Sequence, residues 1–428
     1  MIRTARSGIG PWSPTPHRTR RSLFALIALT ASLVVTTPAA AQPPATPPQR
    51  DGVRWEGTSL HLGDSVRLDP RVRVQADILV HDQSDAIEDR FAWGSRRIGL
   101  NGELFNRVQF QIERAFQDDD DDDTAWRDVY ADVRITRALQ IRGGRFKLPF
   151  SMERNTSREE LDFIQRATVV RALAPARDTG VMVHGRVAGR LLEYEVGVFQ
   201  HADGFESLDN ANSWGPLGET LAGRVILTPI EDRDDSVTRD LQFGVAVVKN
   251  TIPEGLHGVV GRTFAGDRFF DRMHVHGNRT RLGAEALWTA RRLTLKGELL
   301  QLTDQRAQQA ITGDDLSDLV LRGGYITAVV RVAGERGRRG PAVDVAARID
   351  RLSLGSRNDT DDAFTNPRAD NVAPLHKDTW TFGASWLVNR WVRVQGNAIR
   401  ERLVDPLGVR DVSPAGTWVS LVRLQFAL

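Results

Sequence analysis

Basic side chains that could bind anions recur at alternate positions of segments whose other residues are largely apolar. A guanidinium group presents a fork of N–H donors that matches phosphate oxygens, and closely spaced cations replace part of an anion's hydration shell. If the apolar residues face lipid, their neighbours line the lumen of a barrel. We therefore expect these side chains to line a pore: Arg73, Arg97, Arg281, Lys296, Arg348 and Arg393.

A second interpretation is that these cations pair with carboxylates on the same strand faces. Lys296 and Arg348 fall in the middle of their segments, where a pore would be narrow. Opposite charges held close together cancel most of each other's field, so such pairs would brace the wall without attracting anions. The sequence leaves both interpretations open, since the same segments also carry Glu103, Glu285, Glu298, Asp344 and Asp350.

The segments that carry these residues have the pattern of β-strands. Apolar residues alternate with polar ones over about ten positions, which suits a tilted strand that crosses a bilayer. Clear examples begin near residues 72, 98, 282, 343 and 392. We count about sixteen segments, and an even number is typical of bacterial barrels. The sequence thus predicts an all-β fold, a transmembrane antiparallel β-barrel of about 16 strands.

The connections between the segments alternate between short and long. Links such as 290–291 and 389–390 are tight, whereas links such as 148–178, 250–278 and 355–377 are long. Short periplasmic turns and long outer loops produce this alternation. An even number of strands then places both termini in the periplasm.

The last residues of the chain have the same strand pattern. Val422, Leu424, Phe426 and Leu428 share one face, and Arg423 lies on the other. Chain ends usually fray, so a fully patterned terminal strand indicates that it has a partner. We expect it to pair with the strand near residue 71, because an open sheet edge is costly in lipid.

The N-terminal region predicts export. Residues 1–41 combine five arginines and no acid with an apolar stretch at 23–35 and a small-residue cleavage site, as in a signal peptide. Residues 42–70 read as a Pro-rich spacer and an N-terminal periplasmic segment, and 71–428 as the barrel. Without residues 1–41 the chain has 52 basic and 55 acidic residues, so its charge gives no support to nucleic-acid binding.

One stretch resembles a known family. Residues 144–153 read Gly-Arg-Phe-Lys-Leu-Pro-Phe-Ser-Met-Glu and are similar to the signature of the phosphate-selective porin O and P family. Residues 161–167, 173–181 and 383–389 also fit that family. The resemblance implies a sixteen-stranded outer-membrane channel, usually trimeric, with loop 148–178 folded into the lumen. It adds Arg145 and Lys147 to the anion-binding candidates.

The chain departs from the family at two positions. It ends in Leu428 where such barrels usually end in Phe, and Ser385 stands where the family has Asn before Trp386. The resemblance implies passage of phosphate or polyphosphate, but individual arginines cannot be matched to a ladder. Anion-leaning passive diffusion is therefore expected, with phosphate-like solutes as the specific case.

Other functions have less support in the residues. The chain has no cysteine, and the motifs of serine hydrolases and zinc proteases do not occur. We therefore expect no catalytic residues, no metal site and no cofactor. The aspartate run at 118–123 reads as a solvated acidic loop, with calcium binding near lipopolysaccharide as the alternative.

The expected partners are small anionic solutes, outer-membrane lipid with lipopolysaccharide, and two further copies of the chain. The alternative function is a structural or adhesive outer-membrane barrel with a blocked lumen. In that case loop 250–278 would bind the partner through its basic residues, which are Arg262, Arg268, Arg272, His274 and His276.

Overall fold

The computed structural model describes most of the chain after residue 51. Its described residues are 52–81, 90–116, 125–200, 218–231, 238–264, 268–334, 340–356, 367–369, 372–406 and 416–428. The expected signal peptide and the aspartate run at 118–123 lie outside them.

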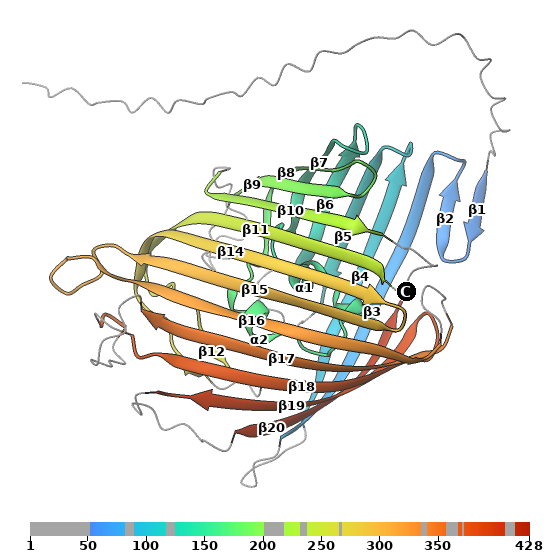
Figure 1. Cartoon of the computed structure of the whole chain (residues 1–428). Helices are drawn as coiled ribbons and strands as arrows, with labels where there is room; N and C mark the ends of the chain where they lie inside the picture. The colour runs from blue at the N-terminus through green and yellow to red at the C-terminus, as the bar shows by residue number, and fades with distance from the viewer. Residues whose placement is uncertain are drawn as a thin grey trace, which may run out of the picture. The chain divides into compact units, whose positions relative to one another are not determined.

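Sixteen antiparallel strands form one closed barrel, as the sequence predicts (Figure 1). Each strand pairs with its neighbour along the barrel, and β20 returns to pair with β3. The barrel strands are β3 (Val66–His81), β4 (Arg90–Leu104), β5 (Val108–Ala115), β6 (Trp126–Arg134), β7 (Gln140–Lys147), β8 (Arg177–Val187), β9 (Leu192–Phe199), β10 (Thr220–Ile230), β11 (Thr238–Gly255), β14 (Val275–Ala290), β15 (Leu293–Arg306), β16 (Leu316–Ala333), β17 (Ala342–Ser356), β18 (Leu375–Leu387), β19 (Val392–Val404) and β20 (Thr417–Ala427).

Alternation along each strand separates an outer apolar face from an inner polar face. On β15, Leu299 is 70 % exposed, whereas its neighbour Glu298 is 2 % exposed. On β17, Ile349 is exposed and Arg348 is buried. The exposed apolar side chains are the surface that lipid would solvate, and the buried polar ones are inside the barrel.

The terminal strand closes the barrel. Phe426 pairs with Val74 and Ala427 with Arg73, and the Leu428 N–H donates to the Val72 carbonyl at 2.9 Å. An additional hairpin, β1 (Val53–Glu56) and β2 (Ser59–Leu62), pairs with the start of β3 at Val66–Leu68. Two different segments thus pair with the two ends of β3 on the same side.

Short and long connections alternate around the barrel, so one rim carries tight turns and the other carries loops. Two paired strands are longer than the sequence pattern indicates. β11 continues to Gly255 and β14 starts at Val275, so a ladder extends into the expected loop 250–278. Backbone pairing does not require apolar side chains, and the apolar alternation therefore underestimates strand length where strands reach water.

Helices are few and short in the described part of the chain. They are α1 (Met152–Asn155), the 3-10 turn η1 (Arg158–Glu160) and α2 (Thr168–Leu173). No described helix is long and apolar enough to cross a membrane. All three belong to the connection between β7 and β8, which runs through the barrel interior (Figure 1).

A second connection also turns inward. Between β11 and β14, the small hairpin β12 (Gly261–Arg262) and β13 (Arg268–Phe270) precedes Met273. Phe269, Phe270 and Met273 are buried in the cluster that includes the inward-facing Leu302 of β15. A large part of the loop considered for adhesion is therefore packed inside the barrel.

Candidate functional site

The inward segment 148–178 starts at a buried carboxylate of the barrel wall. Glu298 of β15 accepts hydrogen bonds from the backbone N–H groups of Met152 at 3.1 Å and Glu153 at 2.7 Å. It also accepts one from the Tyr325 hydroxyl at 2.7 Å. These donors satisfy a carboxylate that water does not reach, and they fix the position of α1.

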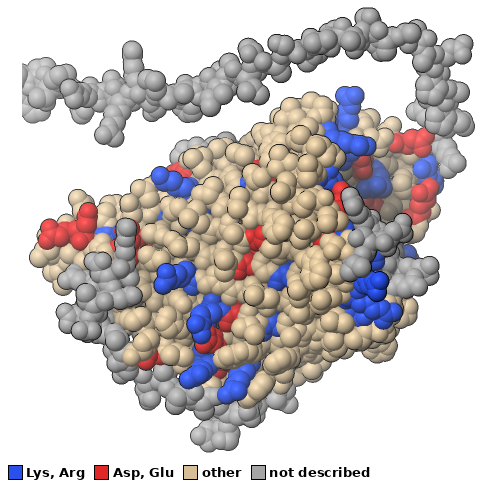
Figure 2. All heavy atoms as spheres, in the orientation of Figure 1, with Lys and Arg blue, Asp and Glu red and all other residues tan. Residues whose placement is uncertain are grey.

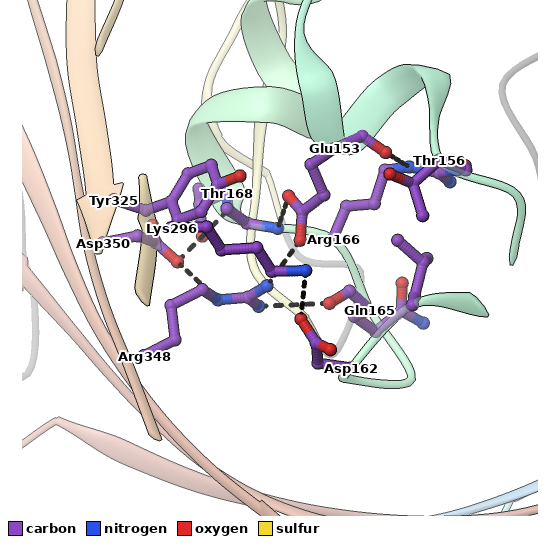
Figure 3. A network of polar contacts seen from close by, with 12 residues as sticks. Glu153, Thr156, Asp162, Gln165, Arg166, Thr168, Lys296, Tyr325, Arg348 and Asp350 are labelled. Atoms are coloured by element: carbon purple, nitrogen blue, oxygen red, sulfur yellow. Dashed lines mark hydrogen bonds and ion pairs between the residues drawn. The ribbon is translucent and has the colours of Figure 1, made fainter. Parts of the chain in front are cut away.

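Arg348 holds the middle of the same segment (Figure 3). Its guanidinium contacts Glu153 Oε1 at 3.0 Å and donates to the Gln165 carbonyl at 3.1 Å. It also lies 4.6 Å from the centroid of the Phe163 ring. The other oxygen of Glu153 accepts from the Ala167 N–H at 2.9 Å, directly before α2. Arg348 is thus an anchor of the segment.

Three further expected pore cations also bind the inward segment. Lys296 forms an ion pair with Asp162. Arg281 donates to the Leu173 carbonyl at 2.8 Å, and Arg393 donates to the Glu159 carbonyl at 2.9 Å. Lys296 and Arg348 thus form ion pairs with Asp162 and Glu153 of the inward segment, which the two interpretations of the sequence did not consider.

Apolar packing adds to these polar anchors. Val169, Val170 and Leu173 of α2 are buried together with inward-facing residues such as Leu321 and Leu352. The α2 helix contacts β15, β16 and β17. This side of the lumen is therefore filled by protein.

The loop rim on the same side is filled by the segment between β11 and β14. Lys377 is fully buried, forms an ion pair with Glu401 and donates to the Arg262 carbonyl at 3.1 Å. Its ammonium lies 4.9 Å from the Phe264 ring centroid. Arg279 pairs with Asp304 and donates to the His257 carbonyl at 2.9 Å. Both inward segments thus pack against the β14–β19 wall.

A cavity of about 350 Å³ lies between the inward segment and the opposite wall, which is built mainly by β3–β8. Among its lining residues, nine are basic and five are acidic, a formal excess of four positive charges. Three of the predicted site residues line it: Arg73, Arg97 and Lys147. Six basic residues complete the lining: Arg71, Arg142, Arg154, Arg158, Arg166 and Arg177.

Carboxylates neutralise several of these cations. Arg97 Nη1 contacts Glu113 Oε1 at 3.0 Å, and Arg177 Nη2 contacts Asp128 Oδ2 at 2.8 Å. In contrast, the Lys147 ammonium donates to the carbonyl oxygens of Asn155 and Thr156, both at 3.2 Å.

Arg154, like Lys147, donates to a backbone carbonyl oxygen: its Nε lies 3.2 Å from the Pro175 oxygen. Neither Lys147 nor Arg154 has an ion-pair partner among the described residues. Carbonyl oxygens satisfy donors without cancelling their charge, so these two side chains contribute most directly to a positive potential in the cavity.

Glu159 connects the inward segment to the cavity wall. Its carboxylate binds Arg71 at 2.7 Å and also pairs with Arg73. Burial raises the pKa of Glu159, but Arg73 and Arg71 outweigh that effect, so the pKa lies below its ordinary value. A depressed pKa keeps the carboxylate ionised as the pH falls through the usual carboxylate range.

Glu159→Gln is therefore expected to raise the anion-to-cation permeability ratio. The exchange removes one negative charge, which raises the net charge of the cavity by one, and it releases two arginines. One charge changes the permeability ratio by up to about fivefold, at ~1 kcal/mol in water. Reversal potentials in a salt gradient measure the ratio. Glu160→Gln is the control for charge alone. Glu160 lines the same cavity but forms no ion pair with Arg71 or Arg73 in the described part of the chain. Lowering the pH from 7 to 5 in the parent protein should leave the permeability ratio unchanged, because Glu159 stays ionised. A rise equal to that of Glu159→Gln would contradict the lowered pKa of Glu159.

Arg145 is placed differently from the other candidates. The β6–β7 and β7–β8 registers pair it with Val129 and Thr179, while the cavity-lining Arg142 pairs with Asp132 and Met182. Directly paired residues point to the same side of a sheet. Arg145 therefore shares the face of Val129 and not that of the cavity.

Sequence reasoning missed part of the cavity. Arg71 shares a strand face with Arg73, and the alternation alone could have identified it. The positions of Arg154, Arg158 and Arg166 depend on the path of the inward segment, and no local pattern specifies that path.

The comparisons with known proteins agree with this architecture. Residues 71–426 match the sequence model of the family described as phosphate-selective porin O and P. No curated protein sequence gives a significant match.

Solved structures match at low identity. OmpT of Vibrio cholerae has 11% identity and a TM-score of 0.55, with 85% of this chain and 98% of that chain covered. An anion-selective porin from Comamonas acidovorans has 13% identity and a TM-score of 0.52, with 85% and 100% covered.

The outer membrane channel DcaP of Acinetobacter baumannii has 10% identity and a TM-score of 0.53, with 85% and 98% covered. These likenesses show the fold. Because the family match spans almost the whole barrel, the chain belongs to the phosphate-selective porin O and P family and is a passive outer-membrane channel, not an enzyme.

Proposed function

We propose that this channel admits small anions in preference to cations, and that the cavity between the inward segment and β3–β8 sets the preference. The observation that carries the proposal is the excess of basic over acidic residues in the lining of this cavity. Lys147 and Arg154 matter most, because their hydrogen bonds go to neutral carbonyl oxygens. Phosphate or polyphosphate is the proposed specific solute.

Two comparisons support the anionic solute. The family is described as phosphate-selective, and one structural relative is titled an anion-selective porin. The chemistry of the cavity agrees with both, because guanidinium and ammonium groups bind phosphate oxygens. Several weak cationic contacts allow an ion to enter and to leave, as conduction requires.

The test is the double variant Lys147→Gln/Arg154→Gln in planar bilayers. We expect its anion-to-cation permeability ratio to fall by about fivefold or more, because the two residues supply half of the cavity's excess charge and each charge is worth up to ~1 kcal/mol. We also expect phosphate to inhibit chloride current less strongly. The matched control is Lys249→Gln/Arg351→Gln, which removes two cations from exposed positions outside the barrel.

An unchanged permeability ratio in Lys147→Gln/Arg154→Gln would contradict the role of the cavity. If phosphate leaves the parent current unaltered, the phosphate preference is wrong and a general porin remains. The adhesive alternative predicts no current steps at all.

We also propose an oligomeric state for the chain and a signal for its export. One structure of OmpT from Vibrio cholerae is described as a trimer form, at 9% identity and a TM-score of 0.53, and a homotrimer is the proposed state here. Residues 1–41 are proposed as the signal peptide that directs the chain to the outer membrane.

A further inference from the structure

Basic side chains gather on the outer surface of the barrel near the loop rim. They lie over β16, β17 and β19, on the face that Figure 2 shows. Each is exposed, although its strand neighbours on both sides are mostly apolar or buried. We call these four residues the rim patch: Arg322, Arg351, Arg400 and Arg402.

The strand registers bring the members of the rim patch together. Asp378 of β18 pairs with Arg351 of β17 on one side and with Arg402 of β19 on the other. Gly324 of β16 pairs with Arg351, so Arg322 lies two residues further along β16 toward the loop rim. Directly paired residues are about 5 Å apart and diagonal ones about 7–8 Å, so the guanidinium groups can reach a common ligand.

The depth of the rim patch follows from its neighbours on the outer face. Ile326, Ile349 and Phe382 are strongly exposed on the same outer face and mark the apolar band. Trp380 pairs with Arg400, and Arg400 pairs with Trp418.

Tryptophan prefers the level of lipid headgroups. Trp380 also pairs with Ile349, which pairs with Ile326, so the tryptophans and Arg400 share a row with the upper apolar residues. Arg351 and Arg402 lie in the next row toward the loop rim, and Arg322 lies in the row after that.

Two of the four arginines in the rim patch have no compensating carboxylate among the described residues. Arg351 Nη2 binds Asp378 Oδ2 at 3.0 Å. Arg322 and Arg402 have no hydrogen-bond or ion-pair partner among the described residues. Arg400 lies 5.9 Å from the Trp418 ring centroid.

We infer that the rim patch binds the phosphoryl groups of a phosphorylated glycolipid in the outer leaflet. Arginine on a lipid-facing strand is unfavourable in hydrocarbon and is tolerated near the interface. At headgroup depth its fork binds phosphate oxygens through paired hydrogen bonds. Charge complementarity therefore favours an anionic headgroup as the occupant. The inference is independent of the proposed solute, because these side chains face away from the lumen.

The test uses the full-length barrel purified in detergent and titrated with purified lipopolysaccharide, with binding measured by native mass spectrometry. A basic residue near an anionic lipid surface contributes about fivefold in affinity. Arg322→Gln/Arg402→Gln should therefore weaken binding by about 25-fold. These two residues are chosen because their removal leaves no described carboxylate without a partner.

Arg291→Gln/Arg390→Gln is the matched control, since it removes two exposed arginines at the opposite rim. We expect parent-like lipid binding from this control. A heat-modifiability gel establishes that each variant is folded. Single-channel conductance should be the same in all three proteins.

Chemically dephosphorylated lipopolysaccharide provides a second arm that needs no variant. It should bind the parent protein about as weakly as intact lipid binds Arg322→Gln/Arg402→Gln. Equal binding of the two lipids by the parent would overturn the inference, as would equal affinity of parent and variant for intact lipid. Loss of oligomers in the variant would assign the rim patch to a second copy of the chain and would also overturn it.

Discussion

Arg348→Ala is expected to lower the free energy of unfolding by about 3–5 kcal/mol, the range found when one partner of a buried ion pair is removed. The Arg348 side chain is fully buried, and its loss leaves the Glu153 carboxylate without its cation. The same change removes the hydrogen bond to the Gln165 carbonyl and the contact with the Phe163 ring. Urea titration in detergent measures the loss.

Arg348→Ala should also release the inward segment from the β17 wall. We expect larger and noisier single-channel conductance, because segment 148–178 would no longer be fixed against one side of the lumen. Arg351→Ala is the matched control on the same strand. Its side chain is 65% exposed and pairs with Asp378, so its removal should cost at most about 1 kcal/mol. Similar losses in the two variants would show that Arg348 does not anchor the segment.

Deletion of Phe426–Leu428 is expected to abolish assembly of the barrel. The deletion removes the pairing of Phe426 with Val74 and Ala427 with Arg73, and the hydrogen bond from Leu428 to Val72. The corresponding groups of β3 would then face lipid without partners, at a cost of several kcal/mol for each unsatisfied group. The fraction of heat-modifiable protein after refolding into vesicles measures assembly.

The control for this deletion removes residues 53–62, the β1–β2 hairpin. That hairpin also pairs with β3, but at Val66–Leu68, where Val66 pairs with Leu104 beside the short turn at Phe105. Water can replace its hydrogen bonds at the turn rim, so most of this protein should still assemble. Assembly of the Phe426–Leu428 deletion at the parental level would show that β20 does not need its last residues to close the barrel.

The β14–β19 side of the barrel is filled by protein, and the cavity lies toward the β3–β8 side. Cations such as Arg348 and Lys296 hold the filling in place, while Lys147 and Arg154 at the other side donate to neutral carbonyl oxygens. The two kinds of cation therefore have different expected phenotypes: Arg348→Ala mainly affects stability and conductance, and Lys147→Gln/Arg154→Gln mainly affects selectivity.

The sequence alone determined the barrel and the direction of most side chains. Alternation placed Arg73, Arg97, Arg281, Arg348 and Arg393 on the inner face, because a strand turns every second residue to the same side. The pattern of 418–428 also indicated the closing strand. Arg145 was taken from a family signature and not from the alternation of its own strand, and the strand registers pair it with Val129 and Thr179.

Only the tertiary structure decided which inner cations stay available to a solute. Arg348 meets Glu153 across 195 positions of the chain, and Arg393 meets the Glu159 carbonyl across 234. Such pairs depend on the path of segment 148–178, which many distant contacts fix together. The period of a strand is a local property and tells which way a side chain points; the partner it finds there is set by segments that fold back from far along the chain.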